Sequence, residues 1–178
     1  SAEEGISTGI IKLDGRLIII LDFEKIMTDI NPETGLKVTE IDELGERGRY
    51  DIPILIAEDS PLLNKLIVDC LHKAGYSNLI HTENGQRAYE VICACKEEGT
   101  LHEHVQCVIT DIEMPQMDGH RLTKLIKTDS RFEGLPVVIF SSLVNEEMKR
   151  KGEALGVDAQ LSKPEIGRLV RQLDLLLN

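Results

Sequence analysis

The chain has 178 residues, of which 42% are hydrophobic and 29% charged, and it contains no tryptophan. This composition is typical of a soluble globular protein, and the length allows one ordinary domain plus a smaller segment. Twenty basic against 31 acidic residues give a formal net charge of -11. Such a surface repels nucleic-acid phosphates, which disfavours a DNA-binding role.

The longest apolar stretch, residues 17–21, is too short to cross a bilayer, and the chain does not open with a signal sequence. We therefore expect a cytoplasmic protein. The cysteines show no C-x-x-C spacing and are expected to be free thiols. They are Cys70, Cys93, Cys95 and Cys107.

Two strand-like runs, residues 8–13 and 16–21, are joined by Asp14 and Gly15, a strong hairpin signal. The polar segment 29–51 has no sustained apolar face and is predicted to be a linker. A hairpin cannot bury enough surface to fold alone. We expect it to pack on the rest of its own domain, on the body of this chain or on a second chain.

From residue 53 onward, short apolar runs alternate with segments of helical periodicity, the pattern of an α/β protein. We expect a five-stranded parallel sheet with helices on both faces and the strand order 2-1-3-4-5, a common solution for right-handed crossovers. The predicted strands are residues 53–57, 79–82, 105–110, 137–140 and a run ending near Leu161.

The segments between the strands carry helix signals. Ser60 and Asn84 are predicted N-caps, and Asp118 with Gly119 is predicted to begin a third helix. A fourth helix is expected over residues 145–155, ending at Gly156. The last helix has apolar residues spaced to cover a sheet face.

Polar side chains end or follow the predicted strands. They are Asp59, Asp111, Ser141 and Lys163. In a parallel sheet the carboxyl ends of the strands meet at one edge, and open α/β sheets bind ligands there, at the switch point between strands one and three. Carboxylates, a hydroxyl and an ammonium at one edge suit a divalent cation together with a phosphoryl group.

Glu58, Asp59 and Asp111 match the preference of Mg²⁺ for a few carboxylate oxygens, with phosphate and water completing the shell. The cation would relieve carboxylate repulsion and leave an Asp111 oxygen free to attack phosphorus. Lys163 and Ser141 would supply charge and a donor to the phosphoryl oxygens. Each residue alone is more often an ordinary loop or capping residue, so the hypothesis depends on the whole set.

Four segments resemble the response-regulator receiver domain of two-component signalling. They read ILIAEDS at residues 54–60, ITDIEMPQMDG at 109–119, FSS at 140–142 and SKP at 162–164. The resemblance implies a flavodoxin-like receiver domain over residues 52–178. Receiver domains often carry an aromatic switch residue three positions before the lysine, where this chain has Gln160, so any conformational output would run through Ser141.

The resemblance also implies a role for each site residue. Asp111 would be the phosphoacceptor, Ser141 the switch hydroxyl and Lys163 the phosphate-sensing lysine. The Mg²⁺ ligands would be Glu58, Asp59, Asp111 and the backbone carbonyl of Glu113.

Residues 9–26 are similar to the closing part of a CheW-like adaptor domain of bacterial chemotaxis, so residues 1–28 are expected to be the end of such a domain. An adaptor followed by a receiver is the arrangement of CheV-type coupling proteins. The resemblance implies a non-catalytic signalling protein that takes its phosphoryl group from a CheA-type histidine kinase and contacts chemoreceptors through the adaptor.

Two other functions remain open. A phosphatase of the haloacid-dehalogenase type also uses an aspartate nucleophile, but it needs a second aspartate two residues later, where Glu113 stands. A binding module that never takes phosphate is disfavoured by the complete set of acids, hydroxyl and lysine.

Overall fold

The computed structural model describes residues 7–13, 16–21 and 36–178. The chain divides into two compact units, Ser1–Gly35 and Leu36–Asn178. In the first unit, β1 (Ser7–Leu13) and β2 (Arg16–Leu21) pair as antiparallel strands, as predicted. The predicted turn at Asp14 and Gly15 lies outside the described residues.

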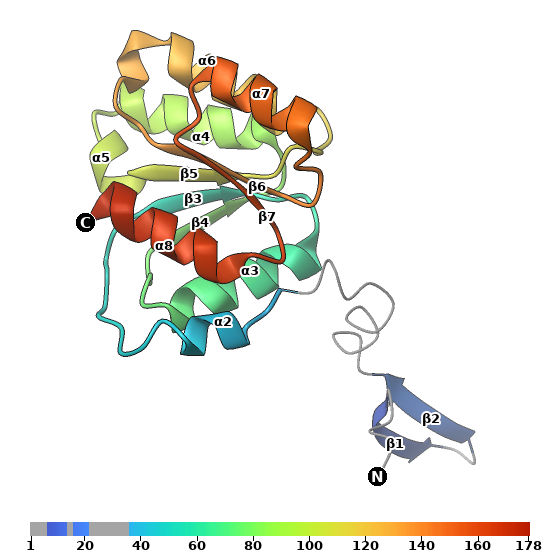
Figure 1. The fold of residues 1–178 in the computed structure, drawn as a ribbon. Coiled ribbons are helices and arrows are strands. Elements are labelled where there is room, and N and C mark those ends of the chain that lie inside the picture. Colours follow the sequence, from blue (N-terminus) through green and yellow to red (C-terminus); the bar gives the residue numbers. More distant parts are fainter. Residues whose placement is uncertain (1–6, 14–15, 22–35) are drawn as a thin grey trace. The chain divides into compact units, whose positions relative to one another are not determined.

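The second unit is built on a five-stranded parallel sheet in the order β4-β3-β5-β6-β7 (Figure 1). In chain order this is 2-1-3-4-5, which confirms the predicted fold. The strands are β3 (Ile54–Ala57), β4 (Leu79–Thr82), β5 (Cys107–Thr110), β6 (Val137–Ser141) and β7 (Ala159–Ser162).

The third predicted strand begins later than expected. Residues Leu101–His104 form the short helix α5, and the Val105 amide donates back to the Leu101 carbonyl at 2.7 Å. Strand pairing of β5 with β3 therefore begins at Cys107. The apolar pattern placed Val105 in the strand because its side chain is buried. A buried apolar residue gives the same pattern whether it begins a strand or follows a short helix.

Helices cover both faces of the sheet, with α3 and α8 on one face and α4 and α6 on the other (Figure 1). Helix α7 lies next to α6. The predicted caps are present: for example, Asn84 Oδ1 accepts from the Arg87 amide at 2.8 Å, and Gly156 ends α7 with a φ of 81°. The helices are α3 (Pro61–Lys73), α4 (Gly85–Glu97), α6 (Gly119–Thr128), the 3-10 turn Ser130–Phe132, α7 (Glu146–Leu155) and α8 (Ile166–Leu177).

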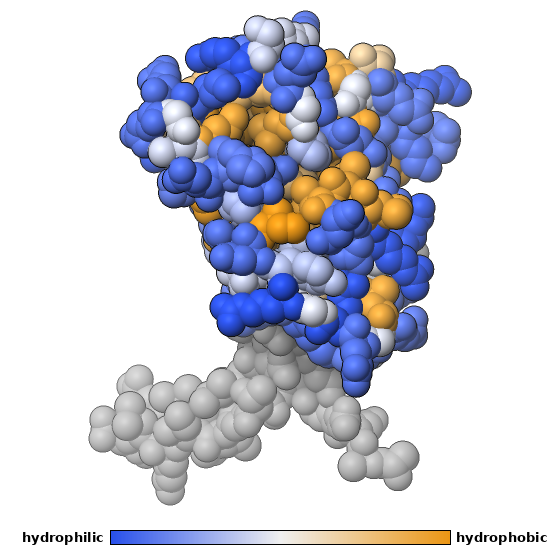
Figure 2. Space-filling model, turned by 90° about the vertical axis from the view of Figure 1, so that its left-hand side faces the viewer, coloured by the Kyte–Doolittle hydropathy of each residue, from blue (hydrophilic) through white to orange (hydrophobic). Residues whose placement is uncertain are grey.

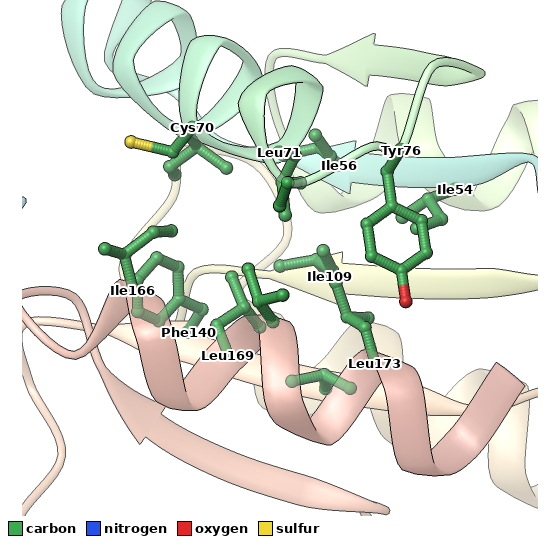
Figure 3. Packing of buried hydrophobic residues seen from close by; sticks show 14 of the residues in the cluster. Ile54, Ile56, Cys70, Leu71, Tyr76, Ile109, Phe140, Ile166, Leu169 and Leu173 are labelled. Carbon is green, nitrogen blue, oxygen red and sulfur yellow. The ribbon is translucent and has the colours of Figure 1, made fainter. Parts of the chain in front are cut away.

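Alternate side chains of the central strands enter two separate cores. Leu55 points into the core beneath α4 and α6, whereas Ile54 and Ile56 enter the core beneath α3 and α8. Figure 3 shows the second core, where Leu71 from α3 and Leu169 from α8 meet the strand residues. Each fully buried aliphatic side chain contributes roughly 1.5–3 kcal/mol, so this packing holds the strand ends in place.

Residues 36–50 pack on the receiver unit, although the sequence predicts a linker over 29–51. We call residues 36–50 the strap. Its short helix α2 (Thr39–Asp42) buries Ile41 to 2% exposure in the core between α3 and α8. The interaction is hard to see in the sequence because its apolar contacts come from Leu36, Ile41, Leu44 and Tyr50, which are scattered among charged neighbours. Residues 29–35 of the predicted linker lie outside the described residues.

The end of the strap is anchored by Arg47. Its guanidinium makes two hydrogen bonds to Asp174 on α8, at 2.7 and 2.8 Å, and its Nε donates to the Ala74 carbonyl at 3.0 Å. The Tyr76 hydroxyl also donates to Asp174, at 2.7 Å, and the Tyr50 ring lies 5.1 Å from the Tyr76 ring. Burial alone would raise the pKa of Asp174, but the donors Arg47 and Tyr76 outweigh it and lower that pKa.

We expect Asp174→Asn to lower the free energy of unfolding at pH 7 by roughly 1–3 kcal/mol, because charge-assisted hydrogen bonds are lost. The pKa of Asp174 is lower in the folded protein than its ordinary value of 3.8, so the ionised carboxylate stabilises the fold at pH values above 3.8. This stabilisation is lost as the pH falls through the folded-state pKa. The difference from wild type should therefore shrink below about pH 4. Urea unfolding followed by circular dichroism measures it.

Asp42→Asn is the matched control. Asp42 pairs with Lys73 at the exposed surface, so its replacement should cost no more than about 1 kcal/mol. An Asp174→Asn penalty that stayed constant from neutral pH down to strong acid would contradict the assignment of Asp174 as an ionised anchor.

Candidate functional site

The polar residues predicted to converge do lie at one edge of the sheet. Asp59 follows β3 by two residues, Asp111 and Lys163 directly follow β5 and β7, and Ser141 is the last residue of β6. β3, β5, β6 and β7 are neighbours in the parallel sheet. Their carboxyl ends therefore bring these side chains to the same rim.

Three carboxylates gather at this rim. Glu58, Asp59 and Asp111 each offer an oxygen, and the three oxygens lie within 4.8 Å of one another. Glu58 and Asp111 are buried, whereas Asp59 is exposed, so the cluster opens to solvent on one side. Three hard oxygen donors at this spacing, with room left for water and phosphate, fit the coordination preference of Mg²⁺.

Lys163 joins two of these carboxylates. Its Nζ lies 2.6 Å from Glu58 Oε2 and 2.7 Å from Asp111 Oδ2, and the residue is only 2% exposed. Burial alone would lower the pKa of Lys163, but the Asp111 and Glu58 charges outweigh it and raise that pKa. The amine is therefore held as an ammonium ion beside Asp111.

Glu58 behaves differently from its lysine partner. Burial raises the pKa of Glu58 above its ordinary value, and the Lys163 charge offsets this only in part. The ammonium of Lys163 is paired with both Glu58 and Asp111, and Asp59 lies in the same cluster. With all three carboxylates ionised, the site carries more negative than positive charge. A cation at the cluster would relieve that repulsion.

Backbone groups fix the two buried carboxylates. Asp111 Oδ1 accepts from the Ile112 amide at 2.6 Å, and Glu58 Oε1 accepts from the Ser60 amide at 3.1 Å. His81 Nε2 forms a 2.8 Å hydrogen bond with the Glu58 carbonyl. Sequence reasoning missed His81, since only the pairing register of β3 with β4 brings it beside this loop.

Gly119 permits the chain to pass close behind Asp111. A Cβ at Gly119 would lie 1.9 Å from the Asp111 carbonyl oxygen, so no other residue fits without moving the backbone. The Gly119 amide also donates to the Ile112 carbonyl at 2.9 Å. The glycine predicted at a helix start thus also shapes the Asp111 loop.

Ser141 is 1% exposed, and its backbone ties it to the lysine strand. The Ser141 carbonyl accepts from the Lys163 amide at 3.2 Å, while its Oγ accepts from the Leu143 amide at 3.2 Å. Because Oγ serves as an acceptor in that bond, its proton remains to be donated to another group.

Gln160 fills the position at which the receiver resemblance led us to look for an aromatic ring. Its Nε2 donates to the Lys149 carbonyl on α7 at 2.8 Å. A Cβ at Gly152 would lie 2.2 Å from Gln160 Oε1, so the amide packs closely against α7. Gln160 on β7 and the Lys149 carbonyl on α7 thus form a polar contact between these two elements.

Two of the cavities among the described residues lie at opposite ends of the parallel strands. One of about 540 Å³ borders the carboxylate cluster, and its lining includes Asp59 and Glu113. Glu113 thus shares this cavity with Asp59, and the role of its backbone carbonyl as a metal ligand stays a prediction. The other, of about 360 Å³, lies where α5 and the C-terminus meet, a region in which Figure 2 shows exposed apolar residues. Its lining mixes apolar side chains such as Leu101 and Leu176 with charged ones such as Arg131, and among the described residues it contains no cluster of carboxylates, so the chemistry of the first edge decides the location of the site.

A family model described as the response regulator receiver domain matches residues 54–174. The chain belongs to this family. The receiver sheet and the polar rim described above are both contained in the matched region.

Relatives and solved structures agree with this family. The chain is 32% identical to the chemotaxis protein CheV2 of Helicobacter pylori over 92% of its own length and 51% of the relative. It is 25% identical to CheV3 of the same organism over 96% of its length and 55% of the relative. The chain thus spans about half the length of these proteins.

The solved structure of Vibrio cholerae CheY4 is 22% identical and aligns with a TM-score of 0.60, over 72% of this chain and all of that one. At this identity the likeness concerns the fold alone. Within the part of the chain that the structure describes, no helix has the length and apolar character needed to cross a membrane.

Proposed function

We propose that this chain is a phosphorylatable part of a CheV-type chemotaxis coupling protein, with Asp111 as the phosphoacceptor. The observation that carries the proposal is the Asp111 carboxylate, held against the Lys163 ammonium within a cluster of acidic oxygens. The similarity to CheV2 and CheV3 supports the chemotaxis context.

In the proposed reaction, a carboxylate oxygen of Asp111 attacks the phosphorus of a phosphohistidine on a CheA-type kinase. The new O–P bond forms as the N–P bond breaks, and the electron pair stays on the departing imidazole nitrogen. Lys163 and the Ser141 hydroxyl lie at the same rim and would stabilise the charge on the phosphoryl oxygens.

The residues at the rim fit Mg²⁺. Glu58, Asp59 and Asp111 would hold the ion together with the backbone carbonyl of Glu113. When bound, Mg²⁺ supplies positive charge that offsets the negative charge of the carboxylates and the phosphoryl oxygens.

In this proposal the protein acts in the cytoplasm as a signalling adaptor, and its only chemistry is to gain and lose a phosphoryl group. Residues 1–28 would be the end of the CheW-like adaptor domain that contacts chemoreceptors, and residues 52–178 the receiver. Output would run through Ser141 and the loop after β6, because Gln160 replaces the aromatic switch.

The family match favours this proposal over a phosphatase of the haloacid-dehalogenase type. Both functions use an aspartate nucleophile, but a receiver keeps its phosphoryl group for signalling whereas a phosphatase turns over small phosphate esters. Sustained turnover of such esters would therefore contradict the proposal.

Intact-mass analysis tests the proposed function. The purified chain, incubated with a small phosphodonor and Mg²⁺, should gain the mass of one phosphoryl group. Removing divalent ions with EDTA should suppress this gain, because the carboxylates then repel the incoming phosphate. The proposal fails if the protein gains no phosphoryl group in Mg²⁺, or gains it equally in EDTA.

A further inference from the structure

The first half of the strap is bonded to the start of α8. Glu40 Oε2 accepts from the Gly167 amide at 2.9 Å, and a carboxylate at this place satisfies one of the free amides of the first helical turn. A Cβ at Gly167 would lie 2.9 Å from Glu40 Cβ, so the strap and the helix are in close contact. Ile41, beside Glu40, is buried in the core that contains Ile166.

Gly167 stands only four residues after Lys163. Between them, Pro164 restricts the backbone, and Glu165 Oε2 accepts from the Ser162 amide at 3.1 Å. A short, bonded connection therefore joins the lysine at the candidate phosphorylation site to the helix turn that Glu40 holds.

A phosphoryl group on Asp111 cannot leave this connection undisturbed. Lys163 Nζ lies 2.7 Å from Asp111 Oδ2, a distance that leaves no space for a phosphorus atom and its oxygens between them. The ammonium has to move to contact the phosphoryl oxygens instead. Because Lys163 is buried among close-packed neighbours, we expect this movement to shift the backbone that leads to Gly167 as well.

The second half of the strap has a separate anchor. Arg47 bonds to Asp174 near the end of α8 and to the Ala74 carbonyl after α3, and the Tyr50 amide donates to the Gly75 carbonyl at 2.8 Å. None of these groups contacts the rim that carries Asp111. The two halves of the strap should therefore respond differently to a change at that rim.

We propose that the strap is a conformational relay. Phosphorylation of Asp111 displaces Gly167 from Glu40 and loosens residues 36–44, while the Arg47 anchor stays docked. The loosened end is the part of the strap that is continuous in sequence with residues 1–35. This inference rests on the proposed function, since it requires Asp111 to be phosphorylated.

Hydrogen–deuterium exchange with mass spectrometry tests the relay on the whole chain, with and without a phosphodonor in Mg²⁺. Amides of residues 38–44 should exchange about tenfold faster after phosphorylation, as expected for loss of a charge-assisted hydrogen bond. Peptides covering residues 47–50 should be unchanged. Unchanged exchange at residues 38–44 in protein whose mass shows phosphorylation would overturn the relay, whereas absence of the mass gain would instead overturn the proposed function.

Variants of the contact give a second readout. Glu40→Ala should show the faster exchange at residues 38–44 without any phosphodonor, should gain no further increase on phosphorylation, and should accept the phosphoryl group as wild type does. Glu43→Gln is the matched control: it lies next to α2, no hydrogen bond or ion pair of its side chain is seen among the described residues, and its exchange should follow wild type.

Glu40→Gln keeps an oxygen acceptor for the Gly167 amide but loses the charge. It therefore tests the contact even if Glu40→Ala fails to fold. Its exchange before phosphorylation should lie between those of wild type and Glu40→Ala. If both Glu40 variants match wild type in exchange before and after phosphodonor treatment, the Glu40 contact is not the relay.

Discussion

Asp111→Asn is expected to abolish the gain of one phosphoryl group from a small phosphodonor in Mg²⁺. Asparagine keeps the size and the possible hydrogen bond from the Ile112 amide, but its neutral amide cannot form the acyl phosphate. The variant should remain folded, because the loop is held by backbone bonds and by Gly119. Intact-mass analysis measures the loss, and circular dichroism verifies the fold.

Asp118→Asn is the control for this experiment. Asp118 lies on the same loop and caps α6, where its Oδ1 accepts from the Arg121 amide at 2.7 Å, a role that asparagine can also fill. Its phosphoryl gain should equal that of wild type. Equal modification of wild type and Asp111→Asn would mean that another residue is the acceptor.

Lys163→Ala is expected to destabilise the metal-free protein by about 3–5 kcal/mol, because it leaves the buried carboxylates of Glu58 and Asp111 without their counter-charge. Mg²⁺ should restore more stability to this variant than it adds to wild type, since the ion then supplies the missing positive charge. Urea unfolding with and without Mg²⁺ measures both effects. We also expect Mg²⁺ binding to persist while phosphorylation no longer changes the shape of the domain.

Lys127→Ala provides the comparison for that experiment. Lys127 Nζ pairs with Asp158 at 2.7 Å and donates to the Leu135 carbonyl at 3.0 Å, so its removal also breaks a lysine ion pair. This pair is remote from the carboxylate cluster, and Mg²⁺ should not rescue it preferentially. If Mg²⁺ stabilised the two alanine variants equally, the role of Lys163 as the counter-charge of the metal site would be wrong.

Much of the site could be predicted because strand ends are visible in sequence. The apolar run that ends at Ala57 and the one that ends at Thr110 each place an acid just beyond a buried strand, and a parallel sheet brings such ends together. The order of the strands followed from handedness and from short connections. Neither step needs any knowledge of side-chain packing.

Other contacts could not be predicted in this way. His81 reaches the Glu58 carbonyl only through the register of neighbouring strands, and Lys163 pairs with Glu58 as well as Asp111 only once three strand ends are in place. The close fit of Gln160 against Gly152 likewise depends on how α7 lies over β7. Such contacts leave no periodic or spacing signal.

The sequence by itself determined the alternation of strands and helices, the helix caps and the residues of the polar rim, because each depends on neighbours within about one helical turn or one strand. The tertiary structure decided that residues 36–50 dock, through an ion pair between Arg47 and Asp174 that spans 127 positions of the chain. In the sequence, the charged segment 36–50 has the composition of a linker. Its docking could not be predicted because Ile41 packs against α3 and α8, whose residues are far away in sequence.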